Sequence, residues 1–375
     1  MESRAAVIEE PVESDDFRES RPASIETIEV ADPTGEEVLV EVAAGSLCHT
    51  DVAIALGNLD EPYPMAMGHE GAGVVSAVGE DVDSVEPGDH VVLGRIACGQ
   101  CRFCRMGRSN LCETRTRSRQ NGTLRTGDIR FSRDGEPLYH CHGVTSFSEY
   151  TIVTEEVAIP ITDEVPLEQA TLLGCGVFTG VGAVTNTADV EAGSSVVIVG
   201  AGGVGLSAVQ GARLHSAGEV IVIDLVEEKL DIAESLGATH TINPSEADPV
   251  ERVREILPQG ADYAFDVVGL PETTEQCVDV LAPTGTAVIV GTASAGKKSI
   301  DLDMVDVVLG EREIIGSFNG SFSLQLAIPT LAELVAAGKL ELEPLISATR
   351  PLDELNEAMD DLEHGSMRRQ VILPG

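Results

Sequence analysis

The stretch Val196-Val-Ile-Val-Gly-Ala-Gly-Gly-Val-Gly205 decides the fold of this chain. Its first four residues are apolar without alternation, which is typical of a strand buried on both faces of a parallel sheet. Three spaced glycines, Gly200, Gly202 and Gly205, then form a G-x-G-x-x-G pattern. In this pattern the first glycine permits a tight turn, the second lets backbone approach a pyrophosphate, and the third lets the next helix pack on the strand. With Gly203 and Val204, they predict a phosphate-binding loop at a helix N-terminus.

The sequence after this loop strengthens the interpretation. Leu206–His215 can form the helix, Glu219–Asp224 reads as the next strand, and Asp224 closes it about 20 positions beyond the loop, as a dinucleotide site requires. Asp224 would accept hydrogen bonds from the adenosine ribose of NAD and repel the 2′-phosphate of NADP. An ordinary turn between a strand and a helix is the alternative.

From Val177 to Asn319 strands and helices alternate, which predicts a parallel, doubly wound sheet of two mononucleotide-binding halves. The six expected strands are Val196–Val199, Val220–Asp224, Thr239–Ile242, Asp262–Val268, Thr286–Val290 and Glu313–Ser317. The expected helices after the loop are Val226–Leu236, Asp248–Leu257 and Glu272–Leu281.

Before this region the pattern is one of short strands broken by Gly, Pro and Asp, which favours a small β-barrel or sandwich. The expected strands are Ala5–Glu9, Ile25–Val30, Glu37–Ala44, Gly73–Val78, His90–Leu93 and Ser146–Val153. The tail, Phe322–Leu373, is expected to form two helices and a short strand and to return to this first domain. The chain is therefore expected to be an α/β protein with a β-rich domain and a nucleotide-binding domain.

Four cysteines provide the strongest local signal. Cys98, Cys101, Cys104 and Cys112 form C-x2-C-x2-C-x7-C, so that one loop can turn four sulfurs inward around a tetrahedral ion. Four protein ligands leave no open position, which predicts a structural zinc site. Two disulfides or an iron–sulfur cluster are the alternatives.

The segment from Glu113 to His140 is expected to be loop-like and is basic. Six arginines fall within 19 residues. They either contact an anion near the site, or they neutralise acidic surface or lie in a subunit contact. They are Arg115, Arg117, Arg119, Arg125, Arg130 and Arg133.

The composition is strongly acidic. Among 375 residues, 63 are Asp or Glu and 24 are Lys or Arg, which gives a net charge of −39. Such self-repulsion strains a compact fold at low salt but is screened at multimolar salt, so we predict a salt-adapted (halophilic) protein. The same charge disfavours nucleic acid as a partner. Because no run of about 20 apolar residues and no targeting segment is visible, we expect a cytoplasmic protein that does not bind membranes.

Taken together, Cys48-His-Thr-Asp51, Gly68-His-Glu-Gly71, the four-cysteine loop, Gly174-Cys-Gly176 and the glycine loop closely resemble the zinc-dependent alcohol dehydrogenases of the medium-chain dehydrogenase/reductase superfamily. The resemblance covers about Ala5 to Leu373. It implies a GroES-like catalytic domain at 1–176 with two zinc sites and a Rossmann NAD-binding domain at 177–319. Residues 320–375 would return to the catalytic domain.

The resemblance implies that Cys48, His69 and Cys175 hold a catalytic zinc whose fourth position is open to water or substrate. Thr50 would take the substrate proton, and Asp51 would orient the histidine ring. Glu70 would approach the zinc during ligand exchange. Taken alone, a residue such as Cys175 beside two glycines is more often a packing residue, and Asp51 and Glu70 could be solvated acids of a turn.

The resemblance also implies contacts to the cofactor. Thr179 would lie beside the nicotinamide and Lys229 at the adenosine ribose, while His49 and Arg369 would hold the pyrophosphate. A helix cap, an exposed helix residue and a plain loop histidine are the alternatives for Thr179, Lys229 and His49. Gly94 stands where some relatives narrow the pocket with an aromatic residue, which suggests room for bulky alcohols.

We therefore expect an enzyme that reversibly oxidises primary alcohols to aldehydes by zinc-assisted hydride transfer to NAD, with two zinc ions per chain. A thiol-adduct formaldehyde dehydrogenase or a polyol dehydrogenase is the alternative. The length of the 113–145 segment resembles the dimeric branch of the family, so we expect a homodimer joined through the edge of the cofactor-domain sheet near Ile289 and Ile315.

Overall fold

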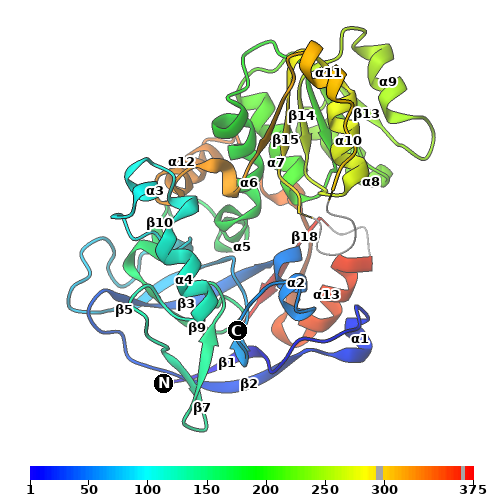
Figure 1. Cartoon of the computed structure of the whole chain (residues 1–375). Coiled ribbons are helices and arrows are strands. Elements are labelled where there is room, and N and C mark those ends of the chain that lie inside the picture. Colours follow the sequence, from blue (N-terminus) through cyan, green and yellow to red (C-terminus); the bar gives the residue numbers. More distant parts are fainter. Residues whose placement is uncertain (293–298, 365–367) are drawn as a thin grey trace. The chain divides into compact units, whose positions relative to one another are not determined.

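The computed structural model describes residues 1–292, 299–364 and 368–375. It divides the chain into two compact units. Unit 1 contains Met1–Cys175 and Phe322–Gly375, and unit 2 contains Gly176–Ser321 (Figure 1).

Unit 1 is built on two β structures that share no strand. A closed barrel has the order β1-β2-β7-β8-β4, and a seven-stranded sheet has the order β10-β6-β5-β3-β18-β17, with β9 also paired to β3. The barrel strands are β1 (Glu2–Ile8), β2 (Ala23–Val30), β4 (Met65–Ala66), β7 (Phe131–Arg133) and β8 (Glu136–His140). The sheet strands are β3 (Glu37–Leu47), β5 (Gly71–Val78), β6 (His90–Leu93), β9 (Tyr150–Thr154), β10 (Ala158–Pro160), β17 (Ile346–Pro351) and β18 (Arg369–Leu373).

The C-terminal segment, Phe322–Gly375, belongs to unit 1 and adds strands to its sheet. Strand β18 pairs antiparallel with β3, the strand that leads to Cys48. Helix α13 (Leu355–His364) buries its apolar face in the same core cluster as α2 (His49–Ala55). The other helices of this unit are α1 (Phe17–Ser20), α3 (Arg102–Arg105), α4 (Glu113–Asn121), α5 (Leu167–Ala170) and α12 (Leu324–Ala336).

The expectation of a loop from Glu113 to His140 is wrong. Residues Glu113–Asn121 form α4, which ends at Gly122 in the left-handed conformation (φ 61°), and β7 and β8 follow as barrel strands. Four of the arginines in this segment pair with carboxylates, which agrees with their role as neutralisers of acidic surface. The pairs are Arg119 with Glu61, Arg125 with Glu36 and Glu156, Arg130 with Glu37, and Arg133 with Glu9 and Glu26.

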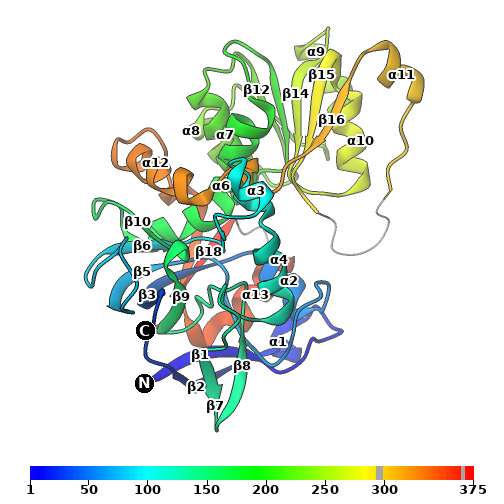
Figure 2. The ribbon, with the colours of Figure 1, turned by 60° about the vertical axis from the view of Figure 1, so that its left-hand side comes forward.

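Unit 2 is a six-stranded sheet in which every pairing is parallel, in the order β13-β12-β11-β14-β15-β16 (Figure 2). This is the order of a dinucleotide-binding sheet, with β11 at the point where the strand order reverses. The predicted fold class, a β-rich domain with a doubly wound parallel sheet, is confirmed. The strands are β11 (Val196–Val199), β12 (Val220–Ile223), β13 (His240–Ile242), β14 (Ala261–Asp266), β15 (Leu281–Ile289) and β16 (Glu313–Gly316).

The helices of unit 2 cover this sheet. They are α6 (Gly176–Gly182), α7 (Gly203–Leu214), α8 (Glu227–Leu236), α9 (Pro249–Ile256), α10 (Pro271–Asp279) and α11 (Met304–Leu309). The core contains the all-buried strands β11 and β12 together with helix residues such as Val253 and Cys277, whereas α11 buries none of its residues. Within the described ranges no single helix is long and apolar enough to cross a membrane.

Candidate active site and metal centres

Four ligand-bearing side chains converge in unit 1. The nearest ligand atoms of Cys48, His69, Glu70 and Cys175 all lie within 4.8 Å of one another. Cys48 follows β3 and caps the N-terminus of α2, His69 and Glu70 lie between β4 and β5, and Cys175 follows the short helix Thr171–Gly174. The structure therefore brings together residues up to 127 positions apart, the difference between 48 and 175.

Gly68 shapes the turn that presents His69. Its φ is +97°, and a Cβ atom at this position would lie 2.4 Å from the backbone nitrogen of Phe147. Only glycine combines this conformation with this close approach. The backbone around Gly68 therefore fixes this turn without help from a bound metal.

Asp51 fixes the orientation of His69. Both side chains are fully buried, and Asp51 Oδ1 lies 2.7 Å from His69 Nδ1. The other carboxylate oxygen of Asp51 accepts a hydrogen bond of 3.0 Å from the backbone N–H of Cys48. One buried carboxylate thus ties two of the predicted ligands together, and Nδ1 carries the ring proton.

His69 Nε2 then faces the cluster, 3.6 Å from Glu70 Oε1. It is buried and has no hydrogen-bond partner, a state that is costly unless another ligand occupies it. Two sulfurs and an imidazole nitrogen are the donor set of a catalytic zinc. Glu70, the fourth group, accepts a hydrogen bond from Arg369 Nη1 on its Oε1 at 3.1 Å, while its Oε2 is buried without a partner. The residues therefore fit zinc with an open coordination position.

Burial and charge shift the pKa values of this cluster. A hydrogen bond with Cys175 lowers the pKa of the Cys48 thiol. Burial opposes protonation of His69, but the adjacent Asp51 outweighs it and raises the pKa of the imidazole to about 9. Burial raises the pKa of Glu70 to about 7. Perturbations of this kind gather at functional sites.

The hydroxyl predicted to take the proton lies beside the cluster. Thr50 Oγ1 is 3.8 Å from Cys48 Sγ, a contact set by the first turn of α2. His49, its neighbour on the same helix, is exposed. Arg369, expected at the pyrophosphate, lies on β18 in unit 1, is 5% exposed and contacts Glu70.

Gly94 does not open the site in the expected way. A Cβ atom at position 94 would meet Ile159 at 2.5 Å, so the missing side chain leaves no free space. The next residue, Arg95, is buried and contacts His142. The sequence analysis did not single out Arg95 or His142, although an arginine inside the apolar run Val91–Ile96 indicates a buried charge.

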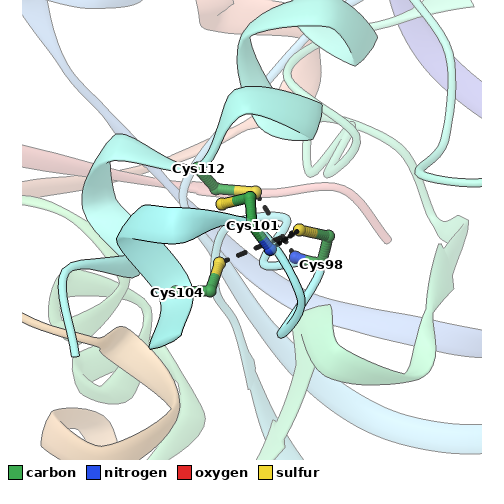
Figure 3. A group of neighbouring side chains, drawn as sticks. All are labelled: Cys98, Cys101, Cys104 and Cys112. Carbon is green, nitrogen blue, oxygen red and sulfur yellow. Dashed lines mark hydrogen bonds between the residues drawn. The ribbon is translucent and has the colours of Figure 1, made fainter. Parts of the chain in front are cut away.

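The four-cysteine loop forms a second cluster (Figure 3). The Sγ atoms of Cys98 and Cys104 are 4.0 Å apart, and the N–H groups of Cys98 and Cys101 point at sulfurs of the cluster, 3.4 Å from Cys112 Sγ and 3.3 Å from Cys98 Sγ. Despite its burial, backbone N–H groups lower the pKa of the Cys98 thiol to about 6. All four thiols are free, which argues against the disulfide alternative.

In the glycine loop of unit 2, the backbone conformation and the space around each glycine agree with the expected pattern. Gly200 has φ +105°, and a Cβ atom at Gly205 would lie 1.9 Å from the carbonyl oxygen of Gly200. At Gly202 a Cβ atom would meet nothing within 4 Å. The loop is therefore closed by protein at two glycines and open at the third, where a pyrophosphate would approach.

Asp224 follows β12 and faces this loop. Its Oδ2 accepts a hydrogen bond of 2.7 Å from Ala201 N, and its Oδ1 accepts one of 2.9 Å from Val226 N. Thr179 lies within α6 rather than at its cap, and Lys229 lies half-buried in the first turn of α8. Gly203 and Val204 open α7.

Two family models match large parts of the chain. Residues 34–163 match the alcohol dehydrogenase GroES-like domain, and residues 203–337 match the zinc-binding dehydrogenase family. An S-(hydroxymethyl)glutathione dehydrogenase of Escherichia coli O139:H28 is 41% identical over 99% of this chain and 100% of its own length.

Two solved structures are similar over the full length of both chains. An alcohol dehydrogenase zinc-binding domain protein from Burkholderia ambifaria has a TM-score of 0.93 at 38% identity. Benzyl alcohol dehydrogenase from Acinetobacter calcoaceticus has a TM-score of 0.92 at 34% identity.

Proposed function

This chain belongs to the zinc-dependent alcohol dehydrogenase family, and on that premise we propose that it oxidises a primary hydroxyl group with NAD as hydride acceptor. The leading substrate is the S-hydroxymethyl adduct that formaldehyde forms with a small thiol. The carbon would lose a hydride, the hydroxyl would lose a proton, and the adduct would become an S-formyl thioester. The relative that is 41% identical supports this choice over a simple alcohol.

One observation carries the catalytic part of the proposal. His69 Nε2 is buried and makes no hydrogen bond, it lies in one cluster with the Cys48 and Cys175 sulfurs, and Asp51 holds the opposite side of its ring. When bound by Cys48, His69 and Cys175, zinc would supply a Lewis acid for the hydroxyl oxygen.

The chain's own residues supply the remaining functions. Asp51 holds the imidazole ring and the Cys48 backbone in one geometry. The Thr50 hydroxyl, next to the Cys48 sulfur, is the group that we propose takes the substrate proton. Arg369 holds Glu70 through Oε1, and the unpartnered Oε2 is the oxygen that we propose approaches the metal during ligand exchange.

We assign the cofactor to the glycine loop of unit 2. The loop residues Gly200, Gly202, Gly203, Val204 and Gly205 would hold the pyrophosphate, since the space at Gly202 is open and α7 begins there. Asp224 would accept the ribose hydroxyls, and its fixed negative charge favours NAD over NADP. His49, Thr179, Lys229 and Arg369 would add further contacts to the cofactor, and we assign unit 1 as the catalytic domain and unit 2 as the cofactor domain.

We propose that the chain forms a homodimer through a surface of unit 2 that includes α11 and the edge of the sheet. Strand β16 is the edge of the sheet, whereas β15, which contains Ile289, is an inner strand. Helix α11, which precedes β16, exposes several large apolar side chains, a pattern that marks interaction surfaces. They are Met304 (69% exposed), Val305 (61%), Val308 (66%) and Leu309 (79%). A sedimentation mass of two chains is expected, and a mass of one or four would contradict the proposal.

Salt adaptation and a cytoplasmic location are further parts of the proposal. The net charge of −39 and the presence of only four lysines support the first. The absence of a long apolar run supports the second.

Absorbance of NADH tests the substrate. Formaldehyde, formaldehyde with a small thiol such as glutathione, and benzyl alcohol would each be offered with NAD and with NADP at molar KCl. We expect oxidation of formaldehyde to require the thiol and to prefer NAD. Oxidation of benzyl alcohol alone would favour the second candidate, an aromatic alcohol dehydrogenase, which the Acinetobacter calcoaceticus structure supports. No signal with any substrate would refute the proposed function.

A further inference from the structure

A second carboxylate lies at the carboxyl edge of the unit 2 sheet, two strands away from Asp224. Asp266 is the last residue of β14 and is fully buried. Strands β11 and β14 are paired neighbours, and the strand order reverses between them. Doubly wound sheets bind their ligand outside the carboxyl ends of the strands at such a reversal. Asp266 therefore lies where the dinucleotide would bind, next to the strand that leads into the glycine loop.

Four hydrogen bonds hold the Asp266 carboxylate. Its Oδ1 accepts from Val268 N at 3.0 Å, from Gly269 N at 2.9 Å and from Thr273 Oγ1 at 3.0 Å. Its Oδ2 accepts from Thr274 Oγ1 at 2.5 Å. Hydrogen bonds to a carboxylate are stronger than those between neutral groups. Because two donors belong to the turn after β14 and two to the first turn of α10, this side chain ties the turn to the helix.

The backbone of Asp266 ties the same turn to the next strand. Its carbonyl oxygen accepts from Val290 N at 2.9 Å and from Gly291 N at 3.0 Å, directly after β15. Gly269 has φ +87°, and a Cβ atom at this position would lie 2.4 Å from Thr292 N. Only glycine allows this approach in this conformation. The turns that follow β14 and β15 are therefore held against each other.

The turn that Asp266 holds packs against the first glycine of the phosphate-binding loop. Val267 N donates to the Val199 carbonyl oxygen at 3.1 Å. A Cβ atom at Gly200 would lie 2.8 Å from Val268 Cγ2 and 2.9 Å from Val267 Cγ2. The two valines thus occupy the space that a side chain at position 200 would need. Since packed groups transmit displacements, a shift of this turn would move the loop.

We propose that Asp266 is a positioning residue for the dinucleotide: by fixing the turn 267–269 it holds the glycine loop in the conformation that binds the cofactor. The inference rests on the proposed function, because it takes the cofactor to bind at this loop. The buried carboxylate acts through the turn and not by contact. Its negative charge alone would disfavour a pyrophosphate nearby, so charge and positioning predict opposite effects when the side chain is removed.

Fluorescence titration of the full-length protein with NADH tests this proposal. Asp266→Ala leaves four donors without their acceptor and should bind NADH about tenfold more weakly, whereas loss of the charge alone would tighten binding. In turnover assays the KM for NAD should rise by a similar factor while kcat at saturating NAD is retained, because the metal site of unit 1 is unchanged. Asp266→Asn keeps an oxygen that can accept three of the four hydrogen bonds and should recover most of the affinity.

Two further variants keep the result interpretable. Thr274→Val removes only the donor to Oδ2 and should weaken NADH binding by a smaller factor, which serves if Asp266→Ala does not fold. Asp262→Asn is the matched control at the other end of β14. Asp262 Oδ2 accepts from Ser195 N at 2.8 Å and from Ser195 Oγ at 2.7 Å, so this variant disturbs similar bonds at the amino edge of the sheet and should leave the NADH affinity unchanged.

The outcomes separate this inference from the proposed function. Unchanged or tighter NADH binding by folded Asp266→Ala or, failing that, unchanged binding by folded Thr274→Val would overturn the positioning role alone. An equal loss of affinity in Asp262→Asn would overturn it as well. A wild-type protein that binds no NADH would overturn the proposed function and this inference together.

Discussion

Replacing Asp51 by asparagine should loosen the catalytic metal without disturbing the fold. Both carboxylate oxygens are used: Oδ1 lies 2.7 Å from His69 Nδ1, and Oδ2 accepts from Cys48 N at 3.0 Å. Asparagine has nearly the same shape but only one acceptor oxygen, so one of the two donors must face an amide NH2 group. Because the site is fully buried, water cannot replace the lost acceptor.

The structure sets the size of the effect. A buried donor left without an acceptor costs about 1–3 kcal/mol, and each 1.4 kcal/mol corresponds to a tenfold change in an equilibrium constant. The zinc affinity of the site should therefore fall about 10- to 100-fold, which is the range found when a group that orients a metal-binding histidine is lost.

Competition with a chelator measures this change. Zinc release from the variant should show one ion lost at about 10- to 100-fold lower chelator concentration, while the ion of the four-cysteine site is retained. Asp353→Asn is the control, since Asp353 pairs with Arg4 at the surface and its side chain is 64% exposed. If folded Asp51→Asn loses zinc only at the same chelator concentration as the control, the assignment of Asp51 is wrong.

Three other predictions concern different parts of the molecule. Gly202→Ala should melt like the wild type, because its Cβ enters open space, yet it should bind NADH at least tenfold more weakly. Gly205→Ala should be destabilised by about 1–3 kcal/mol, because its Cβ would lie 1.9 Å from Gly200 O. Equal melting temperatures for the two variants would contradict this interpretation of the loop. His140 accepts from Arg130 N at 3.1 Å, and burial lowers its pKa to about 3. Because the unfolded chain binds a proton below its pKa of about 6.5 and the folded chain does not, stability should fall with falling pH, by about 1.4 kcal/mol at pH 5.5. Urea unfolding at pH 7.5 and 5.5 should show this loss reduced in His140→Gln, and an unchanged loss would refute it. Finally, the net charge of −39 predicts a melting temperature that rises between dilute buffer and molar KCl, and a flat profile would argue against salt adaptation.

Local spacing explains what could be predicted from the sequence. The glycine loop, the alternation of strands and helices in unit 2 and the four-cysteine loop each depend on residues that are near one another in the chain. Their backbone requirements can be read without knowing the rest of the fold. The connection rules for parallel strands then restrict the orders that the six strands can take.

Long-range placement explains what could not. Helix α4 is polar on every face, so no apolar periodicity marks it; Gly122, which ends it in the left-handed conformation, is its clearest signal. Arg95, His142 and Glu61 come from three separate segments and form one chain of hydrogen bonds only when the barrel and sheet of unit 1 bring them together. No spacing in the sequence joins them.

We propose that unit 1 holds two zinc ions, one enclosed by four cysteines and one bound by Cys48, His69 and Cys175 with a position left for substrate. Elemental analysis of the wild type and of Cys48→Ser tests this most directly. We predict two zinc ions per wild-type chain, and one per folded Cys48→Ser chain, with turnover lost. A single zinc in the wild type, or a Cys48→Ser variant with two zinc ions and full activity, would contradict the account.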